Sequence, residues 1–184
     1  MNLRRPAPLG AQFLDPVLTE ELPVPSIATG GSLYIDGQWC CADTGRTIGV
    51  VNPATEETLC QVAFCGSAEV ARAVEAAQRA LPSWRALTPY QRAVPLRKTA
   101  DLIRQRKEEI ARVLTQEQGK PLAEARLEVE ANATFFEFYA SEGTKIYGEI
   151  VPSLASHKRH FHIWQPIGVC ALISPWNFPL FLQG

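Results

Sequence analysis

A short segment near the end of the chain carries the residue best suited to do chemistry. Asn177 lies within residues 174–180 (SPWNFPL), directly after an apolar run. A fixed asparagine amide can donate a hydrogen bond to an oxygen that becomes negative during a reaction, without giving up a proton. Asparagine also caps helices, and one polar residue specifies no reaction. From this residue alone, a catalytic role and a capping role both stay open.

Histidines and cysteines are the next candidates. His160 and His162 would share one face of a strand, which makes them a possible metal pair. No third ligand is evident, so we expect no metal site. Cys170 falls inside a predicted apolar strand, where a thiol is expected to be neutral and inert. We therefore assign no catalytic cysteine to this chain.

The apolar run before Asn177 predicts the fold class. Residues 167–173 (IGVCALI) are apolar on both faces, which is typical of a central strand in a parallel sheet. Residues 174–180 come directly after this predicted strand. Such a strand needs neighbouring strands, yet only eleven residues follow it. The sequence therefore predicts an α/β fold of which this chain holds only the beginning.

Extended elements are predicted at the start of the chain. Residues 1–32 are rich in proline and lack periodicity, so we expect an extended arm. Asp36-Gly37 between two apolar runs predicts a hairpin of residues 33–35 and 38–40. Two further extended runs, residues 47–51 and 58–65, follow.

Helices are predicted over the middle of the chain. Ser67 is expected to cap the first helix and Pro82 to end it. Thr88 and Gln91 form a capping box at the start of the next, in which we expect a kink at Pro95 and a break near Arg106.

A third long helix is expected to follow Gly119 and to finish near Gly148. Gly119 is predicted to be the C-cap of the preceding helix, with Lys120 near its end. This structural role accounts for residues 117–121, so we assign them no chemistry.

Several segments, taken in order, resemble the NAD(P)-dependent aldehyde dehydrogenase superfamily. These are residues 33–39 (LYIDGQW), 51–56 (VNPATE), 117–121 (EQGKP), 165–169 (QPIGV) and 174–180. The resemblance covers about residues 33–184. It implies a truncated, N-terminal portion of the family's doubly wound NAD(P)-binding domain, here called the partial domain 33–184. Residues 118–125 and 147–149 are most similar to the succinate-semialdehyde dehydrogenase branch.

The resemblance also implies roles for particular residues. Asn177 matches the family asparagine whose amide donates to the oxyanion formed from the aldehyde. Four residues match the backbone segment beside the nicotinamide ribose of NAD or NADP: Ile173, Ser174, Pro175 and Trp176. Residues 153–164 match an extended segment that joins subunits, which implies a homo-oligomer. The family's nucleophilic cysteine and general-base glutamate come later and match nothing in this chain.

The expected function is therefore oxidation of a small aldehyde, such as succinate semialdehyde, to a carboxylic acid with NAD(P)+. The 184-residue chain by itself is expected to be inactive. An alternative is a catalytically inactive remnant, or an interaction module that pairs with intact subunits.

Composition limits the partners. The net charge is −1, which gives no basis for expecting nucleic-acid binding or a polybasic membrane anchor. No secretory signal is visible, and an odd number of cysteines favours a reducing compartment. We expect a cytoplasmic protein.

Overall fold

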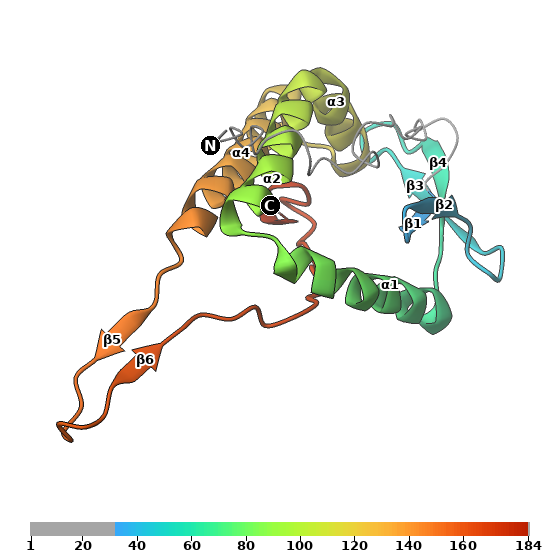
Figure 1. The fold of residues 1–184 in the computed structure, drawn as a ribbon. Coiled ribbons are helices and arrows are strands. Elements are labelled where there is room, and N and C mark those ends of the chain that lie inside the picture. Colours follow the sequence, from blue (N-terminus) through green and yellow to red (C-terminus); the bar gives the residue numbers. More distant parts are fainter. Residues whose placement is uncertain (1–31, 184) are drawn as a thin grey trace, which may run out of the picture.

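The computed structural model describes residues 32–183 and combines small antiparallel hairpins with long helices (Figure 1). The elements, in chain order, are β1 (Leu33–Ile35), β2 (Gln38–Cys40), β3 (Thr47–Val51), β4 (Thr58–Ala63), α1 (Ser67–Ala86), α2 (Pro89–Gln105), α3 (Lys107–Gln118), α4 (Leu122–Glu142), η3 (Gly143–Lys145), β5 (Glu149–Val151), β6 (His160–His162) and η4 (Phe181–Gln183). The predicted arm 1–32 lies outside the described residues except for Ser32.

The predicted hairpin at residues 33–40 is confirmed, and the two extended runs that follow it form a second hairpin, whose pairing was not predicted. Strands β1 and β2 pair antiparallel, with Tyr34 opposite Trp39. Asp36 and Gly37 connect them with φ of 54° and 77°, the positive values that a tight two-residue hairpin turn needs. Strands β3 and β4 also pair antiparallel, with a register shift between Val50 and Val51. Turn chemistry thus accounts for the pairing of β1 with β2.

Helix α1 corrects two predictions. The N-cap is Gly66 rather than Ser67, and the carboxylate of Glu69 accepts the Gly66 N–H at 2.8 Å. The helix also continues through Pro82 to Ala86. A proline removes one backbone donor, but the residues after it keep theirs, so an exposed helix can continue. Pro95 likewise lies inside α2, and the kink there stays a prediction.

The boundaries of α2 and α3 follow the predicted capping residues. Gln91 N–H donates to Thr88 Oγ1 at 3.3 Å, and Thr88 N–H donates to Gln91 Oε1 at 2.8 Å. The helical path is interrupted at Arg106, whose ψ is 15°. Helix α3 ends at Gly119, which has a left-handed φ of 89° and donates to the Thr115 carbonyl. Each of these predictions is confirmed.

Helices α2, α3 and α4 pack together (Figure 1), and most of the side chains buried on them are small. The buried cluster consists of Ala111, Leu114, Ala125 and Val129. Leu180, from the end of the chain, packs against this cluster. Helix α4 ends at Glu142, earlier than the predicted end near Gly148, and η3 continues to Lys145. The helical core therefore also anchors the segment that follows Asn177.

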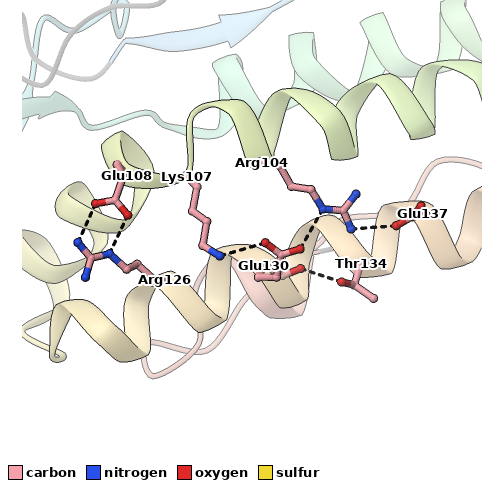
Figure 2. Close-up of polar contacts among 7 residues, drawn as sticks. All are labelled: Arg104, Lys107, Glu108, Arg126, Glu130, Thr134 and Glu137. Carbon is pink, nitrogen blue, oxygen red and sulfur yellow. Dashed lines mark hydrogen bonds and ion pairs between the residues drawn. The ribbon is translucent and has the colours of Figure 1, made fainter.

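Ion pairs fix α4 against α2 and α3 (Figure 2). Arg104 of α2 bonds to Glu130 at 2.9 Å and to Glu137 at 2.8 Å. Arg126 of α4 bonds to Glu108 of α3 at 2.7 Å. These pairs link α4 to both neighbouring helices, but they are partly exposed, and water weakens such ion pairs.

The end of the chain differs most from the prediction. Strands β5 and β6 form a hairpin that projects away from the helices (Figure 1), and β6 falls inside the predicted segment 153–164. Residues 167–173 are not a paired strand, which corrects the sequence prediction. Among residues 32–183 the three strand pairs are all antiparallel hairpins, so this apolar run has no strand beside it. A strand forms only where neighbours accept its backbone hydrogen bonds.

Candidate functional site

Asn177 stands in a turn with its side chain exposed. Its backbone carbonyl accepts a hydrogen bond from Lys120 Nζ at 2.9 Å. Within residues 32–183, no group is hydrogen-bonded to its side-chain amide. The next helical turn, η4, begins only at Phe181, so Asn177 does not cap it. The amide is therefore free to donate to a ligand, as the catalytic hypothesis requires and the capping hypothesis does not.

Beneath this turn lies a buried ion pair that the sequence analysis did not identify. Lys120 and Glu128 are 7% and 1% exposed at their side chains, and Lys120 Nζ bonds to Glu128 Oε2. The ammonium also lies 4.5 Å from the centroid of the Phe178 ring, within range of a cation–π interaction. The segment 117–121, taken from sequence as a helix end only, thus reaches the predicted site.

The same face of α4 holds the rest of the turn. Glu128 Oε1 accepts the backbone N–H of Leu180 at 3.0 Å and that of Phe181 at 3.1 Å. Asn132, one helical turn further on, donates from Nδ2 to the Leu180 carbonyl at 2.8 Å. A sequence signal existed, because Glu128 and Asn132 interrupt the stripe of small apolar residues on α4 at a spacing of four. Polar residues on a buried stripe need partners.

The four predicted cofactor residues form a continuous, open segment before Asn177. Ile173 and Trp176 are 93% and 82% exposed. Ser174 is half-buried, and its hydroxyl accepts from Gln183 Nε2 at 3.0 Å. Exposed apolar side chains on an irregular backbone can lie against a sugar and a planar ring. Their role beside the nicotinamide nucleotide stays a prediction.

The other sequence candidates do not converge. His160 and His162 lie on β6, and His162 Nδ1 is 3.9 Å from Glu149 Oε2. No group of three or more potential metal ligands occurs among the described residues. Cys170 is exposed rather than enclosed in a strand, which corrects its predicted surroundings. None of the helices between residues 32 and 183 is long and apolar enough to cross a membrane.

Comparison with known proteins gives a consistent result. Residues 39–184 match the aldehyde dehydrogenase family. Glutarate-semialdehyde dehydrogenase of Pseudomonas putida is 50% identical over 146 residues, which are 79% of this chain and 30% of that protein. Succinate-semialdehyde dehydrogenase [NADP(+)] of Escherichia coli is 48% identical over 145 residues, with the same shares of 79% and 30%.

A solved structure is similar over nearly the whole described chain. The succinate-semialdehyde dehydrogenase of Burkholderia pseudomallei aligns with a TM-score of 0.82 and 44% identity, covering 89% of this chain and 34% of that one. The chain therefore spans about a third of the length of the relatives it matches.

Proposed function

Because the chain belongs to the aldehyde dehydrogenase family, we propose that the protein containing these residues oxidises an aldehyde to a carboxylic acid with NAD+ or NADP+. The observation that supports this most directly is the exposed side-chain amide of Asn177, which has no hydrogen-bond partner among the described residues. It stands on a turn whose backbone carbonyl accepts a hydrogen bond from Lys120. A donor that stands on an anchored backbone and has no competing partner suits an oxygen on which charge develops.

Each residue of the site has a part in this proposal. Asn177 donates its amide hydrogen to the substrate oxygen and stabilises the negative charge there. Residues 173–176 form one wall beside the nicotinamide end of the cofactor, which accepts a hydride when bound. No residue of this chain is assigned as the nucleophile or as the general base. The 184 residues by themselves are proposed to be inactive.

We infer that the substrate is a small dicarboxylic semialdehyde, with succinate semialdehyde as the first candidate. The support is that relatives at 50% and 48% identity are named for glutarate and succinate semialdehyde. For the cofactor, the Escherichia coli relative is named as an NADP+ enzyme.

A homo-oligomer is proposed for the same protein. Hairpin β5–β6 extends away from the helices (Figure 1), and Ile150 and Phe161 face solvent opposite each other in its register. Contact with a second copy would cover these side chains. We place the protein in the cytoplasm, because all five cysteines are unpaired.

The test is an assay of the protein purified from its native source, after its intact mass has been measured. We expect aldehyde-dependent formation of NADH or NADPH with succinate or glutarate semialdehyde. Asn177→Ala is expected to lower kcat by about 100- to 1,000-fold. Gln78→Ala removes a side-chain amide from the exposed surface of α1 and should leave kcat unchanged.

Two outcomes would count against the proposal. No reduction by the wild-type protein with any semialdehyde would refute the activity, and an intact mass near 20.3 kDa would then support the inactive alternative. A change of less than about threefold in Asn177→Ala would refute the oxyanion role alone.

A further inference from the structure

Residues 177–181, here called the Asn177 loop, have little regular structure of their own. The chain forms a turn at Asn177, and only η4 at its end is helical. Backbone groups in such a loop need hydrogen-bond partners from elsewhere. In this protein those partners are side chains that lie on or just before α4.

Four backbone groups of the loop bond to three buried side chains. Lys120 donates to the Asn177 carbonyl, Glu128 accepts the N–H groups of Leu180 and Phe181, and Asn132 donates to the Leu180 carbonyl. Lys120 and Glu128 also bond to each other, so the contacts at the two ends of the loop share one network.

Stability alone does not explain a buried ion pair at this place. Taking two charges out of water is unfavourable, and apolar residues of similar volume often serve stability equally well or better. An ion pair does supply directional hydrogen bonds, which an apolar pair does not. Its contribution here is to fix the position of the loop backbone.

We propose that Lys120, Glu128 and Asn132 are positioning residues for the Asn177 amide, an inference that rests on the proposed function. They do not touch substrate or cofactor. They hold the backbone at the Asn177 carbonyl and again at Leu180 and Phe181, which leaves the amide exposed and restricts where it points. A displacement of about 1 Å in a reacting geometry can lower turnover by about 100-fold.

Two matched double variants separate positioning from folding. The first, Lys120→Met with Glu128→Leu (the Leu variant), removes both charges and every hydrogen bond from these two side chains to the loop, and fills their space with apolar side chains. The second, Lys120→Met with Glu128→Gln (the Gln variant), also removes both charges but keeps a side-chain carbonyl oxygen that can accept hydrogen bonds from the Leu180 and Phe181 N–H groups. The control is Glu108→Gln on α3, which removes the charge that pairs with Arg126 of α4 without touching the loop (Figure 2).

Hydrogen exchange of the Leu180 and Phe181 amides, measured in the 184-residue chain, reads the loop directly. We expect the Leu variant to lose at least tenfold in protection at both amides, while amides in α2 keep theirs. The Gln variant should retain most of the protection, and the control should match the wild type. Equal protection in the two double variants would overturn the proposal that Glu128 holds the loop.

Steady-state kinetics measure the effect of the loop on turnover. They compare the protein purified from its native source with the same variants. The Leu variant should lose about 10- to 100-fold in kcat with KM within about threefold, and the Gln variant should lose less. Lost protection with an unchanged kcat would overturn the positioning role. If the wild type shows no aldehyde-dependent reduction, the proposed function fails and the catalytic role of these residues fails with it. The exchange result would still decide whether they hold the loop.

Discussion

Replacing Gly119 with alanine would test the contact between the end of α3 and the β3–β4 turn, two segments that are far apart in the sequence. Gly119 ends α3 with a φ of 89°, and its backbone lies against Pro53 in the β3–β4 turn. A Cβ added at Gly119 would be 2.8 Å from Pro53 Cγ. Both the backbone conformation and this close approach therefore require glycine.

The expected loss follows from these two effects. An L-residue in the left-handed region is less stable than glycine by about 1–2 kcal/mol. Carbon atoms normally approach no closer than about 3.5 Å, so the rigid proline ring must also shift. Together we expect Gly119→Ala to lower the free energy of unfolding by about 2–3 kcal/mol.

Urea unfolding followed by far-UV circular dichroism measures this loss. With a slope of about 2 kcal/mol/M, the midpoint should fall by about 1–1.5 M. Gly143→Ala is the matched control, because Gly143 has a right-handed φ of −56° and nothing lies within 4 Å of its added Cβ. There the same change should raise stability by about 0.4–1 kcal/mol.

A double-mutant cycle separates the two effects. In a Pro53→Ala background the contact at Cγ is gone, so Gly119→Ala should lose only the conformational part, about 1–2 kcal/mol. A midpoint for Gly119→Ala within about 0.3 M of the wild type would refute the reasoning. If Gly119→Ala lowers the free energy of unfolding equally with and without Pro53, there is no steric conflict between the added Cβ and the proline ring.

Two further predictions concern the hairpin and the acid stability. The double variant Ile150→Glu with Phe161→Glu places charges on two exposed side chains that face each other in β5–β6, and it should lower the mass of the assembly measured by light scattering. The control Tyr90→Glu, on α2, should leave that mass unchanged. An unchanged mass in the double variant would contradict the contact through the hairpin. Hydrogen bonds from the backbone N–H groups of Asp43 and Gly66 hold the pKa of Glu69 below its ordinary 4.5, so its contribution to stability is present above about pH 4.5 and is lost as pH falls through the folded-state pKa. Glu69→Gln should therefore be less stable at pH 7 with a flatter acid limb in urea unfolding, and identical pH profiles would exclude this role.

The helix ends show how far local sequence reaches. Thr88 and Gln91 cap α2 as predicted, and Gly119 ends α3. Pro82 shows the limit, since α1 continues through it to Ala86. One lost hydrogen bond weighs less than the rest of a helix that can still form.

The candidate site divides in the same way. Asn177 and the four residues before it were located from sequence, because they follow each other in one segment. The buried Lys120–Glu128 pair was missed, since 57 residues separate Lys120 from the Asn177 carbonyl that it holds. Polar spacing on α4 indicated that Glu128 and Asn132 need partners but not which backbone would supply them.

The sequence by itself determined the first hairpin turn, most of the helix ends and the place of the candidate amide, because each depends on residues within a few positions of one another. Only the tertiary structure decided which side chains hold the Asn177 loop, and that residues 167–173 lie without a strand beside them. Long-range hydrogen bonds and strand pairing depend on which surfaces meet, and that is set by how the whole chain packs.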